Sequence, residues 1–345
     1  MHDFAGKLIA WQRVHGRHDL PWQDSRDPYR VWLSEIMLQQ TQVATVIPYY
    51  QRFVARFPEL ANLAAATQDE VLEHWSGLGY YSRARNLHAA AQRVVNDFNG
   101  EFPRQIADIV SLPGIGRSTA AAIAAFCFDT HAAILDGNVK RVLTRQFGIA
   151  GYPGEKATET QLWALAESLL PPGAVDTYTQ ALMDMGATLC SRSRPRCEAC
   201  PVAASCVALA TQQVKVLPTP KPKKSIPHKT TRFIILRHAG RVWLQQRPPT
   251  GIWGGLWSFP ELGVDDDALA ICRDQWQLTI AAVDELPAFR HVFTHFSLTI
   301  YPLIVDIVSL PLQVNDDSGR WSLPATALAM AIPVPARKLL TDMAC

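Results

Sequence analysis

Hydrophobic residues at helical spacing dominate the first two thirds of the chain. Apolar side chains recur every three or four positions, the pattern of amphipathic helices packed around a core. It predicts helices over residues 4–15, 31–45, 118–126 and 139–147, and further helices within 60–75 and 162–189. From residue 232 the pattern changes, and the sequence predicts strands over 232–236, 242–247 and 293–306 and one helix over 267–276. The chain is therefore expected to be multidomain, with an all-α domain followed by an α+β domain.

A stretch rich in proline and lysine separates the two patterns. Residues 216–231 contain Pro218, Pro220, Pro222 and Pro227, so they can sustain neither a helix nor a central strand. We therefore predict a helical domain over 1–215, an extended linker over 216–231 and an α+β domain over 232–345.

Charge and cysteine content narrow the class of protein. The chain has 345 residues and a net charge of only +2, but six basic and no acidic residues lie between Lys215 and Arg232. Such an uneven distribution is compatible with a nucleic-acid partner. Four of the seven cysteines fall within seventeen residues, and the chain shows no secretory leader or long apolar segment. We expect a cytoplasmic protein with a metal or cluster site in a reducing compartment.

A glycine-bearing turn stands before the alanine-rich helix. Within the segment 104–128, Leu112 to Gly116 read LPGIG, and Gly114 and Gly116 permit backbone angles that other residues avoid. The N–H groups at the start of the following helix then form a site for a phosphate oxygen. An ordinary corner between two helices would look similar. What favours function is Asp136, which lies twenty residues beyond the turn and just before the next helix.

A second carboxylate, Glu35, lies on a predicted helix among apolar neighbours. Val31, Trp32 and Leu38 share its face by the spacing of three and four residues. Burial there would raise the pKa of Glu35, so that the carboxyl holds a proton near neutral pH. A glutamate that leans to the helix flank and bonds a polar group fits the same pattern.

Four cysteines carry the clearest metal signal of the chain. They are spaced as Cys190-x6-Cys197-x2-Cys200-x5-Cys206. On ligand count alone, four thiolates suit a tetrahedral zinc ion or a [4Fe–4S] cluster equally well.

These motifs together resemble the helix-hairpin-helix DNA glycosylases of the endonuclease III superfamily, and most of all the adenine DNA glycosylases of the MutY family. The resemblance covers nearly the whole chain and includes the LPGIG turn, Asp136, the SEIMLQQTQ segment around Glu35 and the cysteine spacing. It implies a [4Fe–4S] cluster on Cys190, Cys197, Cys200 and Cys206. It also implies a monomeric enzyme that acts on double-stranded DNA.

Roles for further residues follow from the resemblance. Glu35 would be the general acid that protonates adenine, and Asp136 would stabilise the sugar cation. Gln40 would enter the base stack, Tyr80 would be an intercalating wedge, and Gln180 would contact the adenine edge. Asn138 would position Asp136 or the DNA backbone. Gly114 and Gly116 would contact a phosphate.

One position bears on the type of cleavage. Bifunctional relatives carry a lysine two residues after the second hairpin glycine, where this chain has Ser118. Without an amine to form a Schiff base, base removal alone is expected. Ser118 and the extra C-terminal domain both disfavour a bifunctional glycosylase acting on pyrimidine lesions. A DNA-binding scaffold without activity would leave both carboxylates unexplained.

The C-terminal half resembles the MutT-like (Nudix-fold) domain of the same family. The acidic box that binds magnesium in Nudix hydrolases is missing after Glu261, so we expect recognition instead of pyrophosphate hydrolysis. Phe293, Thr294 and His295 match the family's loop that senses 8-oxoguanine, with threonine where serine is usual. An ordinary strand carrying two histidines is the alternative. The expected substrate is adenine opposite 8-oxoguanine or, more weakly, opposite guanine.

Overall fold

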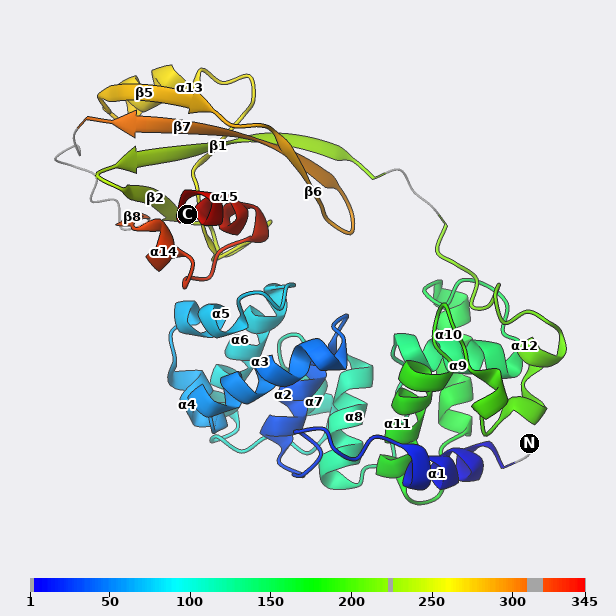
Figure 1. The fold of residues 1–345 in the computed structure, drawn as a ribbon. Helices are drawn as coiled ribbons and strands as arrows, with labels where there is room; N and C mark the ends of the chain where they lie inside the picture. Colours follow the sequence, from blue (N-terminus) through cyan, green and yellow to red (C-terminus); the bar gives the residue numbers. More distant parts are fainter. Residues whose placement is uncertain (1–2, 223–225, 309–318, 345) are drawn as a thin grey trace. The chain divides into compact units, whose positions relative to one another are not determined.

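The chain forms two compact units in the computed structural model, which describes residues 3–222, 226–308 and 319–344 (Figure 1). The first unit comprises Met1–Ala65 and Asn86–Lys223, and the second comprises Ala66–Arg85 and Lys224–Cys345. Within the described residues, no helix combines the length and the apolar character needed to cross a membrane.

The first unit is helical, as predicted. Its helices are α1 (Phe4–His15), α2 (Pro28–Leu38), α3 (Val43–Arg56), α4 (Leu60–Ala65), α6 (Ser82–Asp97), α7 (Ile106–Ser111), α8 (Arg117–Phe128), α9 (Gly137–Phe147), α10 (Lys156–Ser168), α11 (Val175–Asp184) and α12 (Val207–Ala210), and a π-helical turn, Met185–Leu189, extends α11. Helices α1, α8, α9, α10 and α11 bury a common core that includes Leu8, Leu143 and Tyr178. The sequence predicted α1 and α9 from apolar residues at helical spacing and α8 from its alanine content, and six consecutive residues of α8 are buried.

The helix predicted over 31–45 is wrong in its extent. Asp27 caps α2 by accepting a hydrogen bond from the Tyr29 N–H, so the helix begins earlier, at Pro28. It ends at Leu38, and α3 begins only at Val43. Gln40 adopts a φ of 56°, in the left-handed region that a continuous helix excludes. The intervening turn brings Gln40 to the surface, where it is exposed.

The second unit is built on one mixed sheet. Its strands are β1 (His228–His238), β2 (Arg241–Gln246), β3 (Trp257–Ser258), β4 (Glu261–Leu262), β5 (Ile280–Glu285), β6 (Phe289–Val292), β7 (Ser297–Ile307) and β8 (Gly319–Ser322). The order along the main path is β3-β2-β1-β7-β5, and only β1 and β7 pair in parallel among the described strands. Helix α5 (Gln68–Trp75) also belongs to this unit.

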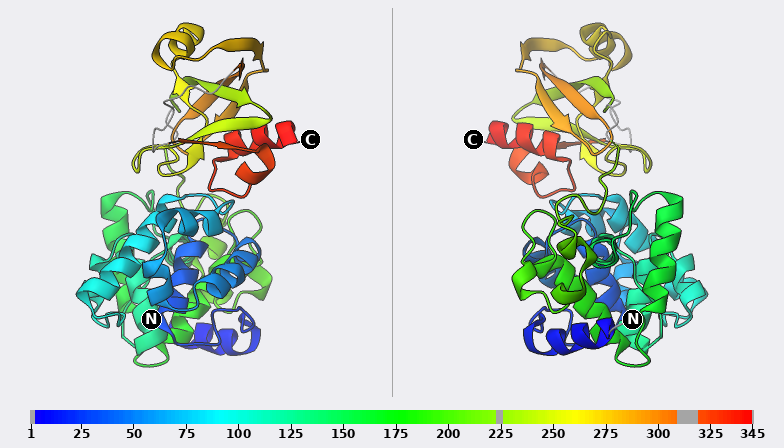
Figure 2. Two further views of the ribbon diagram at one scale, coloured as in Figure 1. Left: turned by 90° about the vertical axis from the view of Figure 1, so that its left-hand side faces the viewer. Right: turned by 90° about the vertical axis from the view of Figure 1, so that its right-hand side faces the viewer.

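Alternate residues of β1 supply two separate cores. Phe233 and Ile235 pack with Leu339 of α15 (Val334–Ala344) on one face of the sheet. Ile234 and Leu236 pack on the other face, beside the segment formed by α13 (Ala268–Ala270) and the π-helical turn Ile271–Gln275. Figure 2 shows α15 and the α13 segment on opposite sides of the sheet. The unbroken apolar run over residues 233–236 is therefore the pattern of a strand buried on both faces.

Three features of the C-terminal half differ from expectation. Residues 228–231, predicted as linker, are part of β1, because the last proline of the run is Pro227 and the backbone after it pairs with β7. Residues 293–296 form a turn between β6 and β7, whereas a strand was predicted from residue 293. Strands β5 and β8, α15 and the short helix α14 (Pro324–Ala327) were not predicted.

The LPGIG turn joins α7 to α8 and uses its two glycines differently. Gly114 has a φ of 78°, and a Cβ there would lie 2.7 Å from the Cβ of Asn86. Gly116, the N-cap residue of α8, has a φ of −90°, and a Cβ would meet nothing within 4 Å. The expectation of special backbone angles is therefore correct for Gly114 and wrong for Gly116.

This difference predicts unequal effects of the same substitution. Gly114→Ala should lower the free energy of unfolding by about 2–4 kcal/mol, from backbone strain together with the overlap with Asn86. Gly116→Ala should cost less than about 1 kcal/mol, the difference between glycine and alanine at an N-cap. Urea titration of both variants measures the two changes. Equal destabilisation would contradict this account of the turn.

Candidate active site

A cleft of about 1610 Å³ in the first unit brings together six of the residues predicted from the sequence. It is lined from α2 and the turn after it, from the start of α8, from the Asp136 loop and from α11. The predicted residues among its lining are Glu35, Gln40, Ser118, Asp136, Asn138 and Gln180. The predicted general acid and the predicted charge-stabilising carboxylate therefore line the same cavity.

The Glu35 carboxyl is adapted to hold a proton. Burial raises its pKa to about 8, and the negative charge of Asp136 contributes to the increase. Its neighbours along α2, Ser34 and Ile36, are buried, and Trp32 is fully buried. At neutral pH the side chain is thus protonated and can act as a general acid.

Asp136 lies at the start of α9 as its N-cap residue. Its Oδ1 accepts a hydrogen bond of 2.7 Å from the backbone N–H of Val139. Burial raises the pKa of Asp136, while hydrogen bonds from Val139 and Asn138 and the charge of Arg141 oppose that increase. The hydrogen bonds and the nearby cation favour the ionised form of Asp136, and the Asp136 charge adds to the effect of burial on the pKa of Glu35.

Ser118 holds the segment that leads to Asp136. The backbone N–H of Leu135 donates to the Ser118 hydroxyl oxygen at 2.9 Å. This bond joins the first turn of α8 to the residue immediately before the carboxylate. The serine that replaces a catalytic amine in the sequence pattern therefore also satisfies a buried backbone donor.

Sequence reasoning missed Arg141, which connects the Asp136 loop to the cysteine segment. Its guanidinium donates to Asn138 Oδ1 at 2.8 Å, to the Gly186 carbonyl at 2.7 Å and to the Cys190 carbonyl at 2.7 Å. Asn138 is thus held by a side chain one turn further along α9. Nothing in the sequence distinguished this arginine from the other basic residues of α9.

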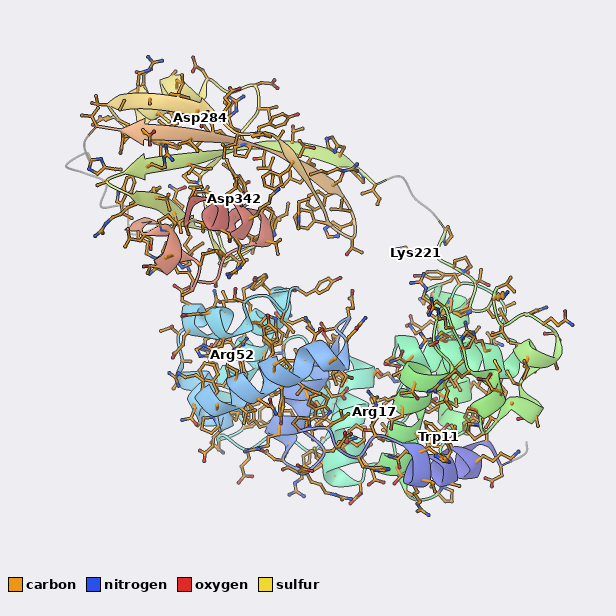
Figure 3. All side chains as sticks on the ribbon, viewed as in Figure 1. Trp11, Arg17, Arg52, Lys221, Asp284 and Asp342 are labelled. Atoms are coloured by element: carbon orange, nitrogen blue, oxygen red, sulfur yellow. The ribbon has the colours of Figure 1, made fainter. Side chains whose placement is uncertain are left out.

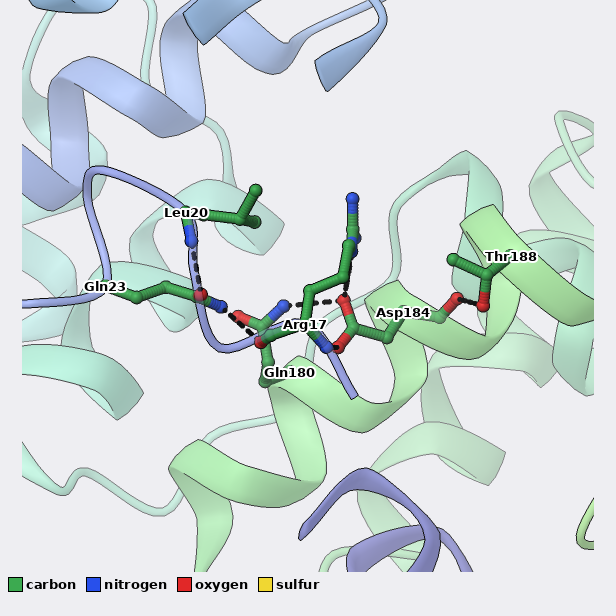
Figure 4. A network of polar contacts seen from close by, with 6 residues as sticks. All are labelled: Arg17, Leu20, Gln23, Gln180, Asp184 and Thr188. Carbon is green, nitrogen blue, oxygen red and sulfur yellow. Dashed lines mark hydrogen bonds and ion pairs between the residues drawn. The ribbon is translucent and has the colours of Figure 1, made fainter. Parts of the chain in front are cut away.

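A second missed group surrounds Gln180. Its Nε2 donates to Asp184 Oδ1 at 2.8 Å, one turn further along α11. Arg17 forms an ion pair with the same carboxylate at 2.7 Å (Figure 4). Figure 3 shows Arg17 on the segment that follows α1. Arg17 and Asp184 are separated by 167 residues in the sequence, so local sequence patterns could not predict their contact.

The four predicted cluster cysteines line one small cavity of about 30 Å³. They are Cys190, Cys197, Cys200 and Cys206, and none of the four is in a disulfide bond. Arg145, buried at 4% exposure, donates to Cys190 Sγ at 3.4 Å. Across the described part of the chain, no group of three or more His, Cys, Asp or Glu side chains is arranged to hold a metal ion. The four sulfur donors around one cavity nevertheless suit a group with several metal atoms.

The remaining predicted residues belong to other parts of the structure. Gly114 and Gly116 form the turn before α8. Tyr80 lies in the second unit with a φ of 48°, is 49% exposed and has the Arg83 guanidinium 5.5 Å from its ring.

The predicted 8-oxoguanine loop is an aromatic turn of the second unit. The Phe293 ring stacks on Phe296 with centroids 4.2 Å apart, and Trp253 packs against it at 5.3 Å. Thr294 and His295 are exposed at the tip. The turn thus exposes one hydroxyl and one imidazole next to the stacked rings of Phe293 and Phe296.

Comparisons with known proteins identify a family for each of the two parts of the chain. Residues 33–168 match the family described as HhH-GPD superfamily base excision DNA repair protein, and residues 231–342 match the NUDIX domain. An adenine DNA glycosylase of Buchnera aphidicola subsp. Acyrthosiphon pisum is 36% identical over 340 residues, which is 98% of this chain and 97% of the relative. The Homo sapiens adenine DNA glycosylase is 34% identical, over 92% of this chain and 70% of the relative.

Solved structures show the same helical fold. A thermostable thymine-DNA glycosylase has a TM-score of 0.55 and 31% identity, and the match covers 60% of this chain and 95% of that one. An endonuclease III in a non-covalent complex with DNA has a TM-score of 0.51 at 20% identity, covering 60% and 94%. With its HhH-GPD region, its NUDIX domain and near full-length similarity to curated relatives, the chain belongs to the family of adenine DNA glycosylases.

Proposed function

We propose that this DNA glycosylase hydrolyses the N-glycosidic bond of adenine mispaired with 8-oxoguanine or guanine and leaves an abasic site. The observation that carries the proposal is the pair of carboxylates in one cleft, with the pKa of Glu35 raised to about 8 next to Asp136. Two acids in one site with different protonation states are the usual means of general acid and charge-stabilising catalysis at neutral pH. A DNA-binding scaffold has no use for such a pair.

The mechanism begins with extrusion of the base, because the target bond is not accessible within a duplex. A mispaired adenine costs less to unstack and enters the cleft beside Glu35. Glu35 donates its proton to the adenine ring, and we assign N7 as the atom that accepts it. The base therefore leaves as a neutral molecule. Base release then leaves positive charge on the sugar.

Asp136 stabilises the positive charge that develops on the sugar. Its carboxylate is fixed by the Val139 N–H, and Ser118 holds the preceding backbone in place. Either an electrostatic contact or a transient covalent bond would stabilise an oxocarbenium-like sugar, as in glycosidases with two carboxylates. Water then adds to C1′ of the sugar, and its proton goes to the Glu35 carboxylate, which restores the acid. Because residue 118 is a serine, we infer base removal without strand cleavage.

We also infer that the four cysteines hold a [4Fe–4S] cluster. The donor set of thiolates around one cavity supports this, and the cysteine spacing resembles the family pattern. When bound, the cluster would fix the loop that carries Arg192, Arg194 and Arg196 toward the DNA phosphates. Thiolate ligands require a reducing compartment, and we propose the cytoplasm.

The NUDIX domain is proposed to recognise 8-oxoguanine through Phe293, Thr294 and His295. Their turn exposes polar groups on an aromatic base, which suits contact with an oxidised purine. Glu261, the acid nearest to where a magnesium-binding box would begin, is paired with Arg247. This arrangement supports recognition over pyrophosphate hydrolysis.

The first test is single-turnover base release from duplexes that carry A:8-oxoG, A:G or A:T. We expect the order A:8-oxoG, then A:G, then A:T, with strand breaks only after alkali treatment. Breaks without alkali would contradict the inference from Ser118. Absence of adenine release from every duplex would refute the proposed function.

The second test concerns the proton on Glu35. Glu35→Gln should reduce base release by about 10²–10⁴-fold, because it removes the general acid but keeps the side-chain shape. Since the carboxyl must be protonated, the wild-type rate should be maximal below a pH of about 8 and fall above it. Glu101→Gln, at an exposed glutamate outside the cleft lining, is the control and should behave as wild type. A Glu35→Gln variant with full activity would exclude Glu35 as the acid.

The third test concerns the cysteine site. The protein purified without oxygen should contain about four iron and four sulfide per chain, as the cluster requires. Cys197→Ser should lower both contents, whereas Cys272→Ser, at a buried cysteine of the second unit, should leave them unchanged. One zinc per chain and no iron would refute the cluster and would support a tetrahedral zinc ion, which the ligand count also allows.

A further inference from the structure

Asp184 is a buried carboxylate that accepts three hydrogen bonds, forms an ion pair with Arg17 and has no direct part in the proposed chemistry. It is fully buried at the last turn of α11. Oδ1 accepts from Arg17 Nε at 2.8 Å and from Gln180 Nε2 at 2.8 Å, and it lies 2.7 Å from the Arg17 terminal nitrogen in the ion pair. Oδ2 accepts from the Arg17 backbone N–H at 2.9 Å. A charge so completely bonded sets the geometry of its neighbours.

The first consequence concerns the amide of Gln180. An amide side chain has a donor end and an acceptor end, and an ionised carboxylate can only accept. The Nε2 end of Gln180 must therefore face Asp184, and the Oε1 end must face away from it. The Gln180 side chain lines the cleft, and no bond to Oε1 is found within the described residues.

Gln23 in the same network gives a useful contrast. Its Oε1 accepts from the Leu20 N–H at 3.2 Å, and its Nε2 donates to the Arg17 carbonyl at 3.0 Å (Figure 4). Both ends of that amide are used by the backbone of the cleft wall. Gln180 has only its donor end used, which leaves the acceptor oxygen for a ligand.

We propose that Asp184 is a positioning residue that orients the Gln180 amide, so that its carbonyl oxygen selects adenine by accepting from the exocyclic amino group. The inference rests on the proposed function, which brings the extruded base into this cleft. Adenine carries a donor at position 6, whereas guanine and hypoxanthine carry an acceptor oxygen there. The fixed Gln180 oxygen would oppose that oxygen, so the enzyme would take the adenine of an A:G mispair and not the guanine.

The test compares adenine with hypoxanthine, which differs at position 6 and keeps N7 for protonation by Glu35. Single-turnover release is measured for each base opposite guanine. In Asp184→Asn the new amide also offers a donor, so Gln180 is free to turn either end toward the base. We expect the adenine-to-hypoxanthine rate ratio to fall by about tenfold or more, the scale of one unmatched buried polar contact.

A double-mutant comparison separates orientation from a general structural effect. In a Gln180→Leu background, Asp184→Asn should leave the rate ratio unchanged, because no amide remains to be oriented. Equal losses for both bases, or the same fall in ratio without Gln180, would overturn the proposal. Glu159→Gln, which breaks the ion pair with Lys140 elsewhere in this unit, is the matched control and should not alter the ratio.

Gln180→Glu keeps the proposal testable if Asp184→Asn does not fold. A glutamate retains an acceptor oxygen toward the base in either protonation state, so adenine should remain preferred. If the donor end of Gln180 is the end that contacts the base, this variant should instead lose its adenine preference, which would overturn the proposal. Adenine release by the wild-type chain reports separately on the proposed function itself.

Discussion

The candidate site depends on one constraint, the capping of α9 by the Asp136 carboxylate. The Val139 N–H needs an acceptor at the start of the helix, and Asp136 provides it. That bond fixes a negative charge beneath the cleft at a point where burial opposes it. Glu35 lines the same cleft, and its own burial, together with the charge of Asp136, raises the pKa of its carboxyl to about 8. The helix terminus at Asp136 therefore contributes to the protonation of the proposed acid.

The parts of the site predicted from the sequence are those whose chemistry is local. Asp136 stands before a helix, Glu35 lies among apolar neighbours on one helix face, and the cysteines follow a short spacing. Each of these signals is contained within one segment. The resemblance to a known family added roles, such as the contact of Gln180 with a base, that composition and periodicity do not supply.

What the sequence could not provide is contact between distant segments. Arg17 and Asp184 meet across 167 residues, and β1 pairs in parallel with β7, a strand far from it in the sequence. The break at Gln40 was also missed, because the polar run over residues 39–42 was taken as part of one helix, whereas Gln40 turns to a φ of 56°. Gly116 shows the opposite error. It was expected to need special backbone angles, but its φ of −90° is ordinary and a Cβ there would meet nothing within 4 Å.

The distribution of polar contacts suggests how the cleft stays rigid while it admits a base. Arg141 and Asp184 each bond to groups from more than one segment, and Ser118 joins the first turn of α8 to the residue before Asp136. None of these three side chains needs to move for the chemistry proposed at Glu35 and Asp136. Electrostatic stabilisation is effective when its groups are oriented before the charge develops, so little reorganisation accompanies reaction. A wall of polar groups already bonded to one another meets that requirement, whereas solvent-exposed side chains would have to be ordered by the substrate.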